Sequence, residues 1–239
     1  MQCRRLCFIR LWIYKTTVMN PWDNILTKSE IDRLRKHDCE YPWTPQDMLR
    51  LIRKIESLQG DVLKIPESGS PWIQTYTGKK LSLLDPQPEE FDLESIAIGV
   101  SREFRFGNQS CVPYTVGQHS YHVSTICKEF PLEGLFHDGV EAFTRDLPSP
   151  LKKVLPQYEI IEKRLWRALA EKFGLQKELP AEVIKADKIM VATECLQLML
   201  KPKEMYSIEE DPININLIPP WPMDLTEGMF KKRYYELTV

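Results

Sequence analysis

The chain has 239 residues, and 32 lysine and arginine residues against 34 aspartate and glutamate residues leave a formal charge of −2 at pH 7. Hydrophobic residues make up 43% and charged residues 28%, the balance of a core-forming globular protein. The near-neutral charge excludes a large net attraction to nucleic acid, so we expect no stable nucleic-acid binding. The sequence contains no apolar run of about 18 residues, so we expect no membrane-spanning helix.

The six cysteines are spread along the chain without a Cys-x-x-Cys pair. This pattern favours reduced thiols in a cytoplasmic protein over a disulfide framework or a zinc ribbon. The four histidines are unevenly distributed, because three of them lie between residues 119 and 137. The fourth, His37, precedes Asp38 in a charged stretch that we interpret as a solvated helix end.

The N-terminal part contains three predicted segments. Residues 1–20 are basic and apolar, and Arg10 splits the apolar run, so they fit a weakly ordered leader better than a signal peptide. Three other interpretations of residues 1–20 stay open: a basic presequence, a segment on a membrane surface, and sequence upstream of a start at Met19. Residues 21–65 show helical spacing and predict a helical appendage. The proline-, glycine- and serine-containing stretch 66–71 predicts a linker.

Residues 72–239 predict a helical domain that begins with a short β-hairpin. The hairpin is expected over 72–81, where β-branched and aromatic residues flank a Gly-Lys turn. Gly174 is the expected C-cap of one helix, and the helix over 224–236 fits either the core or an interface. The proline-rich loop over 201–223 is expected to wrap the surface near a site. Helices are predicted over 92–104, 116–130, 132–143, 157–173, 181–200 and 224–236.

The helix predicted over 132–143 carries His137, Asp138 and Glu141 beside its apolar positions. His137 and Glu141 are four residues apart, which places them on one face of a helix. Polar groups inserted beside an apolar stripe need partners. A divalent metal ion supplies one, because a neutral imidazole and an adjacent carboxylate both bind such ions.

Two further residues fit the same site. His119 opens the preceding predicted helix, and Asp187 lies in the apolar stripe of the helix over 181–200, where a carboxylate is costly unless it is paired or binds a metal. Taken singly, other interpretations stay open: a helix cap or a surface position for His119, and a buried lysine partner for Asp187. Together with His137 and Asp138, these residues indicate a site at which three helices offer two imidazoles and two carboxylates. Such a set suits Mn, Fe, Co, Ni or Zn better than Ca.

Three segments of this region resemble the HD-domain metal-dependent phosphohydrolases, whose signature is H…HD…D on successive helices. Residues 112–120 (VPYTVGQHS) are similar to the family's segment ending in Glu/Gln-His-Ser, and residues 137–152 (HDGVEAFTRDLPSPLK) resemble its HDxxE…DxPxPxK stretch. Residues 184–187 (IKAD) are similar to the segment that carries the last ligand. The resemblance covers about residues 72–239. It implies an all-α HD-domain helical bundle with a small N-terminal β-hairpin, preceded here by an extra N-terminal helical segment.

Within that family the chain resembles in particular the bacterial 5′-deoxynucleotidases and the phage deoxynucleotide (dATP-type) phosphohydrolases. The resemblance implies that the metal is bound by His119, His137, Asp138 and Asp187. It implies that Glu141 positions or deprotonates the attacking water and that Asp146 is the general acid for the leaving oxygen. It further implies that Arg105 and Lys152 hold phosphate oxygens, and that Phe106 packs on the base or sugar.

The histidine count argues for one metal ion. Two-metal HD enzymes need further histidines downstream of the HD pair, and no histidine follows His137. We therefore expect one divalent ion, with Mn, Co, Zn, Ni, Fe and Mg as candidates. His122 lies one turn after His119, and we interpret it as a substrate contact or a supporting residue rather than a spare ligand.

The resemblance leads us to expect a cytoplasmic, homo-oligomeric enzyme of phage or bacterial type. The expected reaction is hydrolysis of the 5′-phosphate of small-molecule 2′-deoxynucleotides by a metal-activated water. A triphosphohydrolase that releases tripolyphosphate from a dNTP such as dATP is the alternative. A non-catalytic HD module that senses nucleotides is a third possibility, which Glu141 and Asp146 disfavour.

Overall fold

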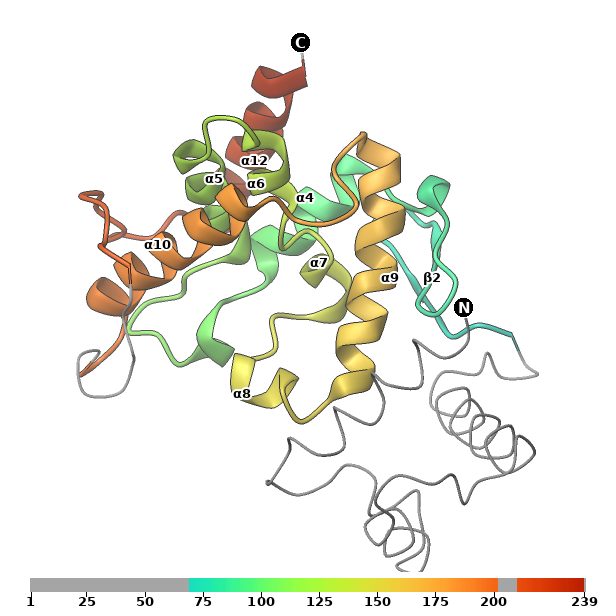
Figure 1. The fold of residues 1–239 in the computed structure, drawn as a ribbon, viewed down its shortest axis with the longest axis horizontal. Coiled ribbons are helices and arrows are strands. Elements are labelled where there is room, and N and C mark those ends of the chain that lie inside the picture. Colours follow the sequence, from blue (N-terminus) through green and yellow to red (C-terminus); the bar gives the residue numbers. More distant parts are fainter. Residues whose placement is uncertain (1–68, 202–209, 239) are drawn as a thin grey trace, which may run out of the picture. The chain divides into compact units, whose positions relative to one another are not determined.

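A computed structural model of the chain describes residues 69–201 and 210–238 (Figure 1). The leader predicted over 1–20, the appendage predicted over 21–65 and the His37-Asp38 pair lie outside these residues. The linker predicted over 66–71 is described only at its last three residues.

The hairpin is present, as predicted. Strands β1 (Trp72–Gln74) and β2 (Lys80–Ser82) pair antiparallel, with Trp72 opposite Ser82. The turn between them includes Gly78 at φ +84°, a left-handed conformation that glycine adopts without strain. The Ser82 amide donates to Oε2 of Glu90 at 2.9 Å, which ties β2 to the short 3₁₀ helix η1 (Pro88–Glu90).

The remainder of the described chain is mainly helical, in agreement with the predicted all-α class. Asp92 caps the first of these helices by accepting from the Ser95 amide at 2.8 Å. Helix α12 packs against α4, α5 and α6, and α10 packs against α5 (Figure 1). The helices are α4 (Leu93–Arg102), η2 (Phe106–Asn108), α5 (Val116–Ile126), α6 (Pro131–Phe136), α7 (Glu141–Thr144), α8 (Ser149–Lys152), α9 (Pro156–Phe173), α10 (Ala181–Leu198) and α12 (Met223–Thr238).

The prediction of one helix over 132–143 is wrong. Helix α6 ends at Phe136, residues 137–140 form a turn, and α7 starts at Glu141. The Gly139 amide donates at 2.7 Å to the carbonyl of Phe136, three residues earlier in the chain. In a continuing α-helix it would instead donate to the residue four positions earlier. A Cβ on Gly139 would lie 2.9 Å from that carbonyl oxygen, so the turn requires glycine's missing side chain. His137 and Glu141 therefore do not share one helix face, and α8 is an element that the sequence pattern did not predict.

Other helix limits differ by a few residues. The helix predicted over 116–130 ends at Ile126, because the carboxylate of Glu182 accepts from the backbone amides of three residues that would otherwise continue it, namely Lys128, Glu129 and Phe130. Gly174 ends α9 in the left-handed conformation at φ +69°, which confirms its role as C-cap.

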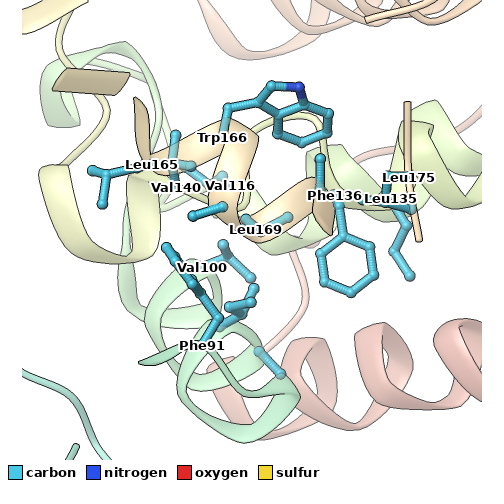
Figure 2. Close-up of a cluster of buried hydrophobic side chains, with 14 of the residues drawn as sticks. Phe91, Val100, Val116, Leu135, Phe136, Val140, Leu165, Trp166, Leu169 and Leu175 are labelled. Atoms are coloured by element: carbon cyan, nitrogen blue, oxygen red, sulfur yellow. The ribbon is translucent and has the colours of Figure 1, made fainter. Parts of the chain in front are cut away.

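Two clusters of buried apolar side chains form the core. The first includes Leu165 and Leu169 of α9 together with Val116 of α5 and Val140 of the turn (Figure 2). The second lies along α10 and includes Val123 of α5. Helix α5 therefore contributes to both clusters, with His119 between its two contributions. Of the residues in α12, Phe230 is buried in the first cluster and Tyr235 is exposed.

The described part of the proline-rich loop, residues 210–222, lies against α10 and α5. The side chain of Gln197 accepts from the Leu217 amide at 3.0 Å and donates to the Ile215 carbonyl at 2.7 Å. The Trp221 amide donates to Oε1 of Gln118 at 2.9 Å. The loop is thus attached to the two helices that carry His119 and Asp187.

No helix among the described residues is long and apolar enough to span a membrane.

Candidate metal centre

The four residues predicted as metal ligands come together from three parts of the fold. His119 is in the first turns of α5, His137 and Asp138 begin the turn after α6, and Asp187 is on α10. The two imidazole Nε2 atoms are 3.2 Å apart. Oδ2 of Asp138 lies 3.2 Å from Nε2 of His137, and Oδ1 of Asp187 lies 3.2 Å from Nε2 of His119. The ligand atoms of His119, His137 and Asp138 therefore form one group within 4.8 Å, and Oδ1 of Asp187 lies beside it, 3.9 Å from Nε2 of His137.

Hydrogen bonds on the opposite side of each imidazole orient the two rings. Nδ1 of His137 lies 2.9 Å from the Gly134 carbonyl oxygen, an acceptor, so Nδ1 is the protonated nitrogen. Nδ1 of His119 lies 2.6 Å from Oε1 of Glu194. In neutral imidazoles these contacts leave the Nε2 lone pairs directed at each other, the arrangement typical of histidine ligands to a metal.

Glu194 is a residue of the site that the sequence did not single out. It is fully buried, and besides His119 it binds Arg105, whose Nε donates to Oε2 at 3.0 Å. Glu194 lies seven residues after Asp187, two helical turns further along α10. That spacing on the same apolar stripe is the signal that could have identified it.

Buried charged groups of the site shift the pKa values of His119 and Asp138. Burial and Arg105 lower the pKa of His119, but Glu194 and Asp187 outweigh them and raise it to about 9. Burial raises the pKa of Asp138, whereas His137, His119 and Arg105 more than offset it and hold that pKa well below the usual range. Asp138 is therefore an ionised carboxylate at neutral pH.

Glu141 lies at the start of α7 and is almost completely buried. Its Oε1 accepts from Nζ of Lys152 at 2.9 Å, while its Oε2 is buried and has no hydrogen-bond partner among the described residues. Burial raises the pKa of this carboxyl well above its usual range, and the negative charges of Asp138 and Asp146 add to the effect. Glu141 thus holds one open oxygen that has a high proton affinity.

Lys152 and Asp146 lie beside Glu141. The ammonium of Lys152, on α8, also donates to Oε1 of Glu162 at 3.0 Å, so two carboxylates hold it. Asp146 follows α7, and its backbone amide donates to Oε1 of Glu103 at 3.3 Å. Burial raises the pKa of Asp146, with Asp138 adding to the effect and Arg105 opposing it.

The remaining predicted residues differ in their surroundings. Arg105 is buried, and its Nη1 donates to Oδ2 of Asp138 at 3.2 Å, while its guanidinium lies 5.7 Å from the ring centre of Phe106.

His122 packs against Tyr121 and Trp221, with ring centres 5.6 and 5.2 Å away. Its Nε2 is buried without a hydrogen-bond partner among the described residues, and burial, followed by the charge of His119, lowers its pKa to about 4. His122 is therefore neutral at pH 7.

Comparison with known proteins identifies relatives without an assigned function. No family model matches the chain. The uncharacterized protein YfdR of Escherichia coli is 33% identical over 171 residues, which cover 70% of this chain and 96% of YfdR. The uncharacterized protein RCAP_rcc00048 of Rhodobacter capsulatus is 29% identical over 150 residues, which cover 58% of this chain and 75% of that protein.

Proposed function

The chain belongs to the same family as YfdR, and we propose that it is an HD-domain metal-dependent phosphohydrolase acting on 2′-deoxynucleoside 5′-monophosphates. One observation carries the proposal. The two imidazole Nε2 atoms and the carboxylate of Asp138 form one close group, and Oδ1 of Asp187 lies 3.2 Å from Nε2 of His119 and 3.9 Å from Nε2 of His137. Along the chain these residues follow the order H…HD…D, with His119 on α5, His137 and Asp138 in the turn after α6, and Asp187 on α10.

The donor set fits a single divalent ion of the first transition series, with Mg as a further candidate. The ligand atoms of His119, His137 and Asp138 lie within 4.8 Å of one another, and hydrogen bonds to the other ring nitrogen orient both imidazoles. When bound, such an ion lowers the pKa of water and polarises a phosphoryl oxygen.

Glu141 and Asp146 have properties that suit proton transfer. Oε2 of Glu141 has no partner among the described residues, so it is the atom to which we assign the proton of the attacking water. The raised pKa of Asp146 suits a carboxyl that keeps a proton for the leaving oxygen. Arg105 and Lys152 are the cations to which we assign the phosphate oxygens, and each of them is paired with two carboxylates in the described structure. Phe106, next to Arg105, is the residue proposed to pack on the base or sugar.

Metal content tests the site directly. His119→Ala and Asp138→Ala are expected to lose bound Mn²⁺, because each removes a ligand atom. His122→Ala is the matched control, since His122 lies one turn from His119 but packs against Tyr121 and Trp221. Elemental analysis and titration calorimetry provide the readout. Wild-type metal content in the Asp138→Ala variant would refute the assignment.

Product analysis tests the substrate. With dAMP and dATP as substrates, we expect inorganic phosphate from dAMP. Release of tripolyphosphate from dATP would instead support the triphosphohydrolase alternative. Binding of deoxynucleotides without turnover of any of them would support a sensing module. Glu141→Ala is expected to lower turnover at least 100-fold, and unchanged turnover would contradict the role given to Oε2.

The proposal includes a cytoplasmic homo-oligomer. Light scattering coupled to size-exclusion chromatography tests the assembly, and a monomer at micromolar concentration would contradict it.

A further inference from the structure

Glu194 is a fully buried carboxylate that contacts two members of the candidate site at once. We propose that Glu194 is a positioning residue of the metal centre, which orients His119 and neutralises Arg105 beside the ligands. The inference rests on the metal site of the proposed function, and it assigns a role to a residue outside the H…HD…D signature.

The first part of the role concerns the imidazole of His119. Oε1 of Glu194 lies 2.6 Å from Nδ1, so the carboxylate keeps the proton on Nδ1 and directs Nε2 toward His137 and Asp187. Without this acceptor, the neutral ring is free to carry its proton on Nε2, which removes the lone pair that a metal needs.

The second part concerns charge. Nη1 of Arg105 donates to Oδ2 of Asp138 at 3.2 Å, so a guanidinium lies next to a proposed ligand of a cation. Arg105 on its own repels a divalent ion and competes with it for Asp138. Oε2 of Glu194 accepts from Nε of the same guanidinium at 3.0 Å and offsets this charge. The two oxygens of one carboxylate therefore favour metal binding in two different ways.

A second buried glutamate provides the matched control. Glu133 is also buried, but the bond described for its carboxylate is with the Gln176 backbone amide at 3.3 Å, and it contacts no proposed ligand. A loss of metal affinity caused only by disturbing a buried carboxylate is expected in Glu133→Gln as well. A loss confined to position 194 points to the contacts with His119 and Arg105.

Two measurements on the full chain test the inference. They are the Mn²⁺ affinity by titration calorimetry and the imidazole N–H proton resonances of the metal-free protein. Glu194→Ala is expected to weaken Mn²⁺ binding about 10- to 100-fold and to lose the exchange-protected N–H signal of His119. Glu194→Gln keeps the shape of the side chain and removes its charge, so we expect this variant to bind Mn²⁺ about tenfold more weakly. It serves as the test if Glu194→Ala does not fold. Glu133→Gln is expected to match the wild type in both measurements.

The outcomes separate this inference from the proposed function. If the wild type binds Mn²⁺, Asp138→Ala does not, and the Glu194 variants bind as tightly as the wild type, the metal site stands and the role of Glu194 is overturned. A wild type without a protected His119 N–H signal also overturns that role. A wild type that binds no divalent metal overturns the proposed metal site and the inference together.

Discussion

The surroundings of Glu141 lower the stability of the fold and suit the proposed chemistry. One of its oxygens is bound to Lys152, and the other is buried without a partner among the described residues. A buried acceptor that lacks a partner costs about 1–3 kcal/mol. The same open oxygen is what a group that accepts a proton from water requires, so the cost and the proposed activity have one origin.

Replacing Glu141 with Gln is therefore expected to stabilise the metal-free protein while lowering turnover. The pKa of Glu141 is raised above its value of 4.5 in the unfolded chain, so the folded state binds the proton more tightly. Its contribution to the free energy of unfolding then becomes less favourable as the pH rises above about 4.5. Because Gln resembles the neutral form, we expect a gain of about 1 kcal/mol at pH 7 that disappears near pH 4. Urea denaturation in EDTA at both pH values measures it.

Glu129→Gln is the control for that experiment, because Glu129 is exposed on the surface. It is expected to change stability little at either pH. A Glu141→Gln variant less stable than the wild type at pH 7 would contradict the electrostatic account.

At the scale of elements, the crossing of α4 and α7 places Glu141. A Cβ on Gly99, in α4, would lie 2.5 Å from Cβ and 2.8 Å from Cα of Ala142, in α7. The two helices can approach this closely only because Gly99 has no side chain. The short helix α7, which begins with Glu141, is thus positioned by a backbone contact with α4.

Gly99→Ala is expected to destabilise the protein by about 1–3 kcal/mol, because the new methyl group meets backbone atoms that must move. The movement of α7 should also displace Glu141 and lower turnover. Gly228→Ala, in α12, is the matched control, since no atom lies within 4 Å of its added Cβ. That variant should be more stable than the wild type by about 0.5–1 kcal/mol through helix propensity alone. Thermal denaturation and turnover measurements of both variants check the pair, and equal effects would contradict the packing argument.

Helical periodicity was sufficient to predict most elements, but not their ends or breaks. The spacing of apolar residues predicted α9 and α10 to within two residues at each end. The break after Phe136 depends on the bond from the Gly139 amide to the Phe136 carbonyl, which the apolar pattern does not encode. The end of α5 depends on Glu182, more than fifty residues away in the chain.

At the scale of the whole molecule, the proposed metal connects both parts of the core. Helix α5 contributes Val116 to one cluster and Val123 to the other, and its His119 faces Asp187 on α10. An ion bound there links α5, the turn after α6 and α10. Metal binding is therefore expected to stabilise the whole described fold rather than one loop.

Mn²⁺ at 100 times its dissociation constant should add about 2.7 kcal/mol to the free energy of unfolding. For a chain of this size that corresponds to a rise in Tm of about 5–10 °C. Differential scanning calorimetry with and without EDTA measures the rise. Ca²⁺ should give a smaller rise, because it prefers a shell of six to eight oxygens, and Asp138→Ala should show none. An equal rise in Asp138→Ala would place the stabilising ion elsewhere.

The amino-acid sequence was enough to predict the mainly helical class and to identify the residues of the proposed site in the order H…HD…D, because periodicity and local motifs are properties of neighbouring residues. The folded structure was needed to find that Glu194 contacts both His119 and Arg105, that Lys152 lies between Glu141 and Glu162, and that His122 packs with Trp221. These contacts join residues from different parts of the fold, for example 10 positions apart in the chain for Lys152 and Glu162 and 89 for Arg105 and Glu194. They form because buried charges and polar rings must find partners within the packed core, and the position of each partner depends on how the helices cross.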